Sequence, residues 1–177
     1  MRRFYKLKYF LSFLGIILVS SCSFKYRENP IKISPGARLP EFNVTLTDGI
    51  TISNSDLCDK TALIVFFNTN CKDCQTELPV INELYQKHND KCVFLAISRA
   101  ETKESVSDFW KKYNLQLPVS PQNDSRIYKL FVELGIPHII ISKNGVVQTV
   151  FNSYLKGFQP TSVELEDAIL HKSTTHE

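Results

Sequence analysis

The sequence predicts an α/β fold in which helices flank a central mixed β-sheet. Residues 61–67 are mostly apolar and β-prone, and the run is long enough for a buried strand but too short for an ordinary helix. Residues 93–97 predict a second buried strand, and stretches of helical periodicity separate the apolar runs. Near the C-terminus, residues 139–141 and 146–151 surround an Asn-Gly pair, which is a strong hairpin signal. Strands alternating with helices, followed by a terminal hairpin, favour the mixed sheet.

Residues 1–21 have the pattern of an export signal, in which a basic segment precedes an apolar stretch. That stretch, residues 9–19, is short for a membrane span of about 20 residues. Residues 19–22, Val-Ser-Ser-Cys, resemble a bacterial lipobox, which implies cleavage before Cys22 and lipidation of that cysteine. An uncleaved N-terminal anchor is the alternative. In both cases we expect an extracytoplasmic, membrane-anchored protein that faces the periplasm, and the choice between inner and outer membrane stays open.

The rest of the chain divides into a spacer and one domain. Residues 22–38 contain scattered Ser, Asn, Pro and Gly without periodicity, so we expect an irregular tether. Residues 39–171 are expected to form the domain, and residues 172–177 to fray. The length of 177 residues suits one domain plus a leader, and we expect a monomer. With a net charge of +3 and no basic patch interleaved with aromatic residues, nothing indicates nucleic-acid binding.

The remaining elements follow from periodicity and turn signals. Alternating residues 42–46 and 50–52 surround Asp48-Gly49 and predict an N-terminal hairpin. Helical spacing predicts a helix that ends at His88, a helix over residues 101–113, a helix from a cap at Asn123 or Asp124 to Gly135, and a final helix over residues 163–170. The third of these helices is expected to bury Ile127, Leu130, Phe131 and Leu134, and residues 117–121 to be extended.

The candidate site is the pair Cys71 and Cys74, which follows the first buried strand and opens a helix. Free N–H groups and the positive end of the helix dipole lie at such a helix start, and both favour a thiolate at Cys71. Cys74 lies one helical turn on, where it can attack a mixed disulfide and release the substrate. We therefore predict that Cys71 is the attacking nucleophile and Cys74 the resolving cysteine.

This pair has two alternatives to a redox role: a structural disulfide, or half of a zinc site. Zinc usually has four protein ligands in structural sites, and the sequence has no second CxxC and no HxxxH. Cys58 could be a third redox thiol, but it is interpreted as packed or idle, and Cys92 is interpreted as structural, because a free Cys is commonly buried as a small apolar side chain.

Several of these residues resemble the TlpA/ResA-like, membrane-tethered branch of the thioredoxin superfamily. Leu-Pro-Glu-Phe at residues 39–42 resembles its entry hairpin, residues 66–74 its active-site loop, and Gly-Ile-Pro at residues 135–137 the segment that carries its cis-proline. Glu77 falls where the branch often has an acidic residue. The resemblance extends from about residue 39 to residue 170 and implies a thioredoxin-like fold with a central βα insertion.

The resemblance also implies roles for individual residues. Cys71 and Cys74 would form a redox-active disulfide, and Pro137 would be cis and face it. The backbone of Ile136 would pair with a bound peptide. Glu77 could accept the proton of Cys74, although an ordinary solvated helix residue is the other interpretation. No cofactor or metal is implied. The expected partners are protein dithiol or disulfide clients, for example apocytochromes, and a membrane electron donor, with reduction as the favoured direction.

The sequence departs from the family pattern around both motifs. Asn70 replaces the usual Trp, Lys-Asp stands between the cysteines, and His138 follows the proline where Thr is usual. A second hypothesis is a copper-binding module in which Cys71, Cys74 and His138 hold Cu(I), because soft thiolates suit that ion. A third, a peroxidase, would centre on a single attacking cysteine in a motif that the sequence lacks.

Overall fold

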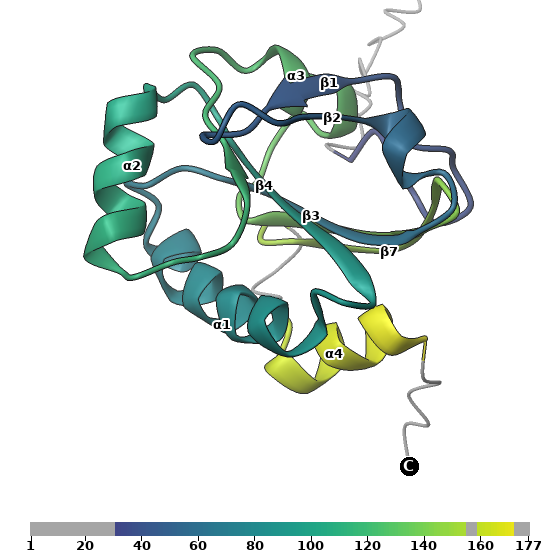
Figure 1. Cartoon of the computed structure of the whole chain (residues 1–177). Coiled ribbons are helices and arrows are strands. Elements are labelled where there is room, and N and C mark those ends of the chain that lie inside the picture. The colour runs from purple at the N-terminus through teal and green to yellow at the C-terminus, as the bar shows by residue number, and fades with distance from the viewer. Residues whose placement is uncertain (1–30, 155–158, 172–177) are drawn as a thin grey trace, which may run out of the picture.

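In the computed structural model, which describes residues 31–154 and 159–171, a mixed sheet separates two apolar layers (Figure 1). Within the described residues the sheet has five strands in the order β5-β4-β3-β6-β7. Their bounds are β3 Thr61–Phe67, β4 Cys92–Ser98, β5 Val119–Ser120, β6 His138–Lys143 and β7 Val146–Asn152. β3 pairs in parallel with β4 and antiparallel with β6. The predicted mixed sheet is therefore confirmed.

Helices cover both faces of this sheet (Figure 1). They are α1 Lys72–His88, α2 Lys103–Lys112, α3 Arg126–Phe131 and α4 Ser162–Leu170. Apolar side chains of α1, α2 and α4 pack on one face, and α3 packs on the other together with an antiparallel hairpin of β1 Asn43–Thr45 and β2 Thr51–Ser53. A short 3-10 helix, Asn54–Leu57, leads from the hairpin into β3. β5 and α3 are the strand and the helix in the stretch where the resemblance implies a central insertion.

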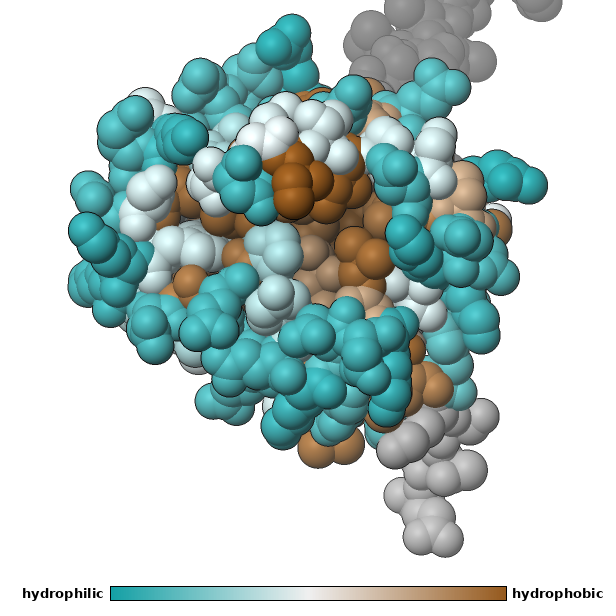
Figure 2. Space-filling model, in the orientation of Figure 1, coloured by the Kyte–Doolittle hydropathy of each residue, from teal (hydrophilic) through white to brown (hydrophobic). Residues whose placement is uncertain are grey.

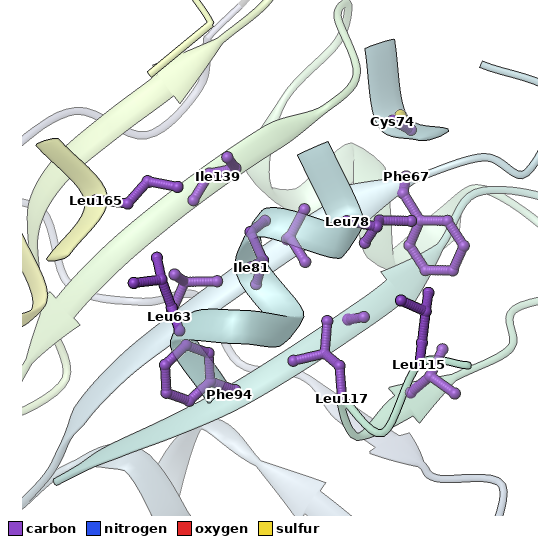
Figure 3. Packing of buried hydrophobic residues seen from close by; sticks show 14 of the residues in the cluster. Leu63, Phe67, Cys74, Leu78, Ile81, Phe94, Leu115, Leu117, Ile139 and Leu165 are labelled. Carbon is purple, nitrogen blue, oxygen red and sulfur yellow. The ribbon is translucent and has the colours of Figure 1, made fainter. Parts of the chain in front are cut away.

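The two layers follow from the sequence of β3, which is apolar on both sides. Leu63, Val65 and Phe67 point into the layer with α1, as Figure 3 shows for Leu63 and Phe67, whereas Ile64 and Phe66 enter the layer with α3. Burial on both faces is typical of strands in a helix-covered sheet, where alternation of apolar and polar residues is lost. In Figure 3, Ile81 of α1 and Leu165 of α4 close the first layer.

The helix predicted between residues 123 and 135 is shorter than expected. α3 begins after Ser125 and ends at Phe131, because Val132 turns extended and pairs with Ile31. The prediction that Leu130 and Leu134 are buried is wrong, since they are 41% and 50% exposed. The helical spacing does not continue past Phe131, so Leu134 lies in a loop instead of on the buried face of a helix.

The described part of the predicted tether packs on the domain. Ile33 is buried in the layer with α3, and the N–H of Gly36 donates to the carbonyl of Val147 over 2.9 Å. Residues 1–30, which include the predicted signal and Cys22, lie outside the described residues, as do residues 172–177. Across residues 31–154 and 159–171, none of the helices has both the length and the apolar character needed to cross a bilayer.

Candidate active site

Cys71 is the N-cap of α1, directly after the turn that follows β3. Its extended backbone, with φ of −81° and ψ of 118°, lets its sulfur accept the N–H of Cys74 at 3.4 Å. This N–H is one of the groups at a helix start that have no partner inside the helix. A donated hydrogen bond and the positive end of the helix dipole both stabilise negative charge on the sulfur. The Cys71 sulfur therefore has a hydrogen-bond donor where an attacking thiolate would need one.

Cys74 lies on the same turn of α1 but in a different environment. It is fully buried, whereas Cys71 is partly exposed, and both are free thiols in this structure. Burial raises the pKa of Cys74 well above the ordinary value of a thiol, and the hydrogen bond with Cys71 acts in the same direction. One sulfur of the pair is thus partly exposed and accepts a hydrogen bond, whereas the other is buried in surroundings that favour its protonated form.

Residues 68–71, here called the CxxC loop, are held by side chains from two other segments. Thr69 donates its backbone N–H to a carboxylate oxygen of Glu101 at 2.9 Å, and its hydroxyl donates to the other oxygen. The side-chain amide of Gln75 donates to the carbonyl of Thr69 at 2.8 Å. Glu101 is buried, at the end of the segment that joins β4 to α2. Sequence reasoning placed Glu101 where a loop joins a helix and missed this contact.

Residues 134–138, here called the cis-proline loop, lie next to Cys71 at the end of the CxxC loop. The peptide bond between Ile136 and Pro137 is cis, and the thiol of Cys71 donates to the carbonyl of Ile136 over 3.6 Å. Ser153, just after β7, donates its hydroxyl to the same carbonyl at 2.6 Å. Two segments that are 65 residues apart in the sequence therefore meet at one sulfur.

Glu77 is buried on α1, one turn beyond Cys74, with only 3% of its surface exposed. The interpretation of Glu77 as an ordinary solvated residue is therefore wrong. Burial raises the pKa of its carboxyl to about 7, and no described residue makes a hydrogen bond to its Oε1. A carboxyl with such a pKa can take up and release a proton near neutral pH.

His138 does not join the two cysteines. Its ring packs 6.1 Å from the ring of Phe66, in the layer with α3, whereas Cys71 and Cys74 belong to the opposite layer. Its Nδ1 lies 2.8 Å from the amide nitrogen of Asn152, so Nδ1 accepts a hydrogen bond and the ring is neutral. Burial lowers the pKa of His138 to about 4.

The copper-binding hypothesis fails on this geometry, because it needs His138 beside both thiols. Within residues 31–154 and 159–171, no three His, Cys, Asp or Glu side chains lie together in a way that could hold a metal ion. The remaining cysteines are also apart from the site. Cys58 is exposed, so it is not a packed residue, and Cys92 is buried, which raises the pKa of its thiol to about 12.

A hollow of about 710 Å³ lies away from the CxxC pair, at the free edge of β4. It is lined by the hairpin, the end of α1 and the segment before β5, and it appears as the brown, hollowed area in the middle of Figure 2. Neither Cys71 nor Cys74 lines this hollow. The candidate reactive site is therefore the place where the CxxC loop meets the cis-proline loop, and not this cavity.

Comparison with known proteins identifies the family of this chain. A model of the AhpC/TSA family matches residues 35–150. The chain belongs to the AhpC/TSA family. Among curated relatives, the thiol-disulfide oxidoreductase ResA of Bacillus thuringiensis subsp. konkukian is 34% identical over 139 residues, which cover 77% of each chain. ResA of Bacillus subtilis is 29% identical, over 77% of this chain and 80% of its own. The predicted resemblance to the ResA-like branch is confirmed, and with it the enzyme class, a thioredoxin-like thiol–disulfide oxidoreductase.

Solved structures support the fold of this family member. The thioredoxin domain of a thiol-disulfide oxidoreductase from Bacteroides vulgatus has a TM-score of 0.66 at 17% identity, covering 78% of this chain and 97% of its own. A secreted disulfide oxidoreductase of Mycobacterium tuberculosis has a TM-score of 0.65 at 20% identity, covering 73% and 95%. The thioredoxin-like fold predicted from the sequence is therefore confirmed.

Proposed function

We propose that this oxidoreductase exchanges disulfides with protein clients through Cys71 and Cys74, and that it acts as a reductant. One observation carries the proposal. The sulfur of Cys71 accepts an N–H at the start of α1 and lies 3.6 Å from the Ile136 carbonyl of the cis-proline loop. An accessible sulfur with support for its anionic form, next to a strand-like backbone edge, suits attack on a disulfide in an extended peptide.

The exchange has two steps. The Cys71 thiolate attacks one sulfur of the client disulfide, so that a mixed disulfide forms and the other client sulfur leaves as a thiolate. Cys74 then loses its proton and attacks the Cys71 sulfur. The second client thiolate leaves, and a Cys71–Cys74 disulfide forms. Two electrons pass to the client, and a membrane electron donor must return them to the enzyme before the next cycle.

Two further residues have roles in this proposal. Glu77 accepts the proton of Cys74 in the second step, because its raised pKa places it near the working pH and it lies one turn away on α1. Ile136 and Pro137 present the backbone on which the client docks, since no described residue accepts a hydrogen bond from the Ile136 N–H. A strand-like peptide could pair with that N–H.

The site of action follows from the N-terminal segment. Residues 1–21 serve as a signal, Cys22 carries the lipid, and residues 22–38 connect the domain, residues 39–171, to the membrane. The clients are then extracytoplasmic proteins with disulfides close to the bilayer, for example apocytochromes. We propose that the enzyme works there as a monomer.

The proposal is tested with cysteine variants and a disulfide-bonded peptide. Cys71→Ser should reduce turnover at least about a thousandfold, because the attacking thiolate is lost. Cys74→Ser should stop at the mixed disulfide, which mass spectrometry detects as an adduct on Cys71. Cys58→Ser is the matched control, because this exposed thiol is separate from the site and its loss should leave turnover unchanged. Persistent turnover in Cys71→Ser would contradict the proposal, and a measured dithiol potential decides whether the enzyme reduces or oxidises.

A further inference from the structure

The Ile136 carbonyl has two donors in the structure, and only one of them belongs to the dithiol. The Cys71 thiol approaches its oxygen to 3.6 Å, and the Ser153 hydroxyl approaches to 2.6 Å. A carbonyl oxygen can only accept, so the hydroxyl of Ser153 must donate. The backbone N–H of Ser153 also donates to the Pro137 carbonyl at 3.3 Å. Ser153 is therefore bound at two successive carbonyls of the cis-proline loop.

The Ser153 contact matters most when Cys71 ionises. A thiol can donate its S–H to the Ile136 oxygen, but a thiolate has no proton to donate and faces the negative end of the carbonyl dipole. Such an arrangement disfavours the anion. A hydroxyl that donates to the same oxygen places a positive hydrogen there and offsets part of its negative potential. The Ser153 hydroxyl should therefore make the thiolate of Cys71 easier to form.

The neighbour of Ser153 already ties the same loop to β7. Asn152 donates its side-chain amide to the Leu134 carbonyl at 3.0 Å and accepts the N–H of Tyr154 at 2.8 Å. Among the described residues, Ser153 is the only side chain besides Cys71 that makes a hydrogen bond to the Ile136 carbonyl. Its hydroxyl thus acts on the one carbonyl that faces the reacting sulfur.

We propose that Ser153 is a positioning residue of the dithiol site, which holds the Ile136 carbonyl and reduces the negative potential that this oxygen presents to the Cys71 sulfur. The proposal rests on the proposed function in one respect, namely that Cys71 reacts as a thiolate. It adds a residue that no motif identified, since Ser153 lies 17 positions beyond Ile136.

The test is the pH profile of Cys71 alkylation by iodoacetamide, followed by mass spectrometry on the reduced protein. Ser153→Ala should move the midpoint of the profile upward by about half to one pH unit, which is a three- to tenfold slower reaction below the midpoint. Ser153→Thr keeps a hydroxyl and should keep the midpoint. Ser107→Ala, an exposed serine on α2, is the matched control and should also leave it unchanged.

Two results would overturn the proposal: an unchanged midpoint in Ser153→Ala, or a midpoint in Ser153→Thr that moves as far as in Ser153→Ala. Should Ser153→Ala fail to fold, Ser153→Gly removes the same hydroxyl and is judged by the same midpoint. A lower melting temperature with an unmoved midpoint indicates a merely structural residue and also refutes the proposal. Failure of the proposed function shows separately, as absence of disulfide turnover in the unaltered protein, because alkylation does not require a client.

Discussion

The CxxC loop and the cis-proline loop meet at the same sulfur but are held in different ways. The CxxC loop depends on side chains, chiefly the carboxylate of Glu101, which takes both hydrogens that Thr69 offers. The cis-proline loop is held by donors, because Asn152 and Ser153 donate to its carbonyls, and Gly135, with a φ of +98°, has no room for a side chain. Removal of the Glu101 acceptor should therefore loosen the CxxC loop, whereas the addition of one carbon at Gly135 should disrupt the cis-proline loop.

The largest effect is expected from adding that carbon with Gly135→Ala. A Cβ at this position would lie 2.0 Å from the side-chain oxygen of Asn152 and 2.8 Å from the Cβ of Tyr154. We expect a loss of about 3 to 5 kcal/mol in the free energy of unfolding, from overlap and from left-handed strain together. Gly49→Ala is the control, because Gly49 has a φ of +91° with nothing within 4 Å and should lose only about 1 kcal/mol. Urea unfolding measures both, and equal losses would remove the packing argument.

Two buried carboxylates lie near the CxxC pair, and they differ in their hydrogen bonds. Glu101 accepts two hydrogen bonds, but the Oε1 of Glu77 has no partner within the described residues. A buried carboxylate without partners is unfavourable as an anion. This explains why burial raises the pKa of Glu77 from 4.5 to about 7.

The second prediction follows from that shift and concerns the pH dependence of stability. The raised pKa means that folded Glu77 keeps its proton up to about pH 7, while the unfolded chain releases it near pH 4.5. The stabilising contribution is therefore complete below pH 4.5 and is lost as the pH rises through 7. Glu77→Gln lacks this titration, so its stability relative to the unaltered protein should rise by about 3 kcal/mol over that interval. Urea unfolding at several pH values measures it, and parallel curves for the two proteins would contradict the prediction.

The sequence could predict what depends on local pattern. The uninterrupted apolar run of residues 61–67 gave the bounds of β3, and Cys71 at the end of the following turn gave the start of α1. Those elements form because residues close together in the sequence favour the same secondary structure. The prediction for residues 123–135 failed because of a contact between residues far apart in the sequence. Ile31 pairs with Val132, where the chain is no longer helical.

Contacts between distant residues also explain what sequence reasoning missed at the site. Glu101 binds Thr69 across 32 positions, and Ser153 binds Ile136 across 17. No local pattern distinguishes this glutamate or this serine from a solvated one. Only the fold, which places the segment after β4 beside the end of β3 and the end of β7 beside β6, brings each to its partner.

The third and smallest effect is expected from removing the acceptor of the CxxC loop with Glu101→Ala. This change leaves the N–H of Thr69, a residue only 8% exposed, without its acceptor, so we expect a loss of about 2 kcal/mol in the free energy of unfolding. Glu101→Gln keeps one acceptor oxygen and should lose less, and Glu104→Ala, an exposed position on α2, is the control. Urea unfolding is paired with the rate of Cys71 alkylation. Lost stability with an unchanged alkylation rate would mean that the start of α1 alone positions the sulfur.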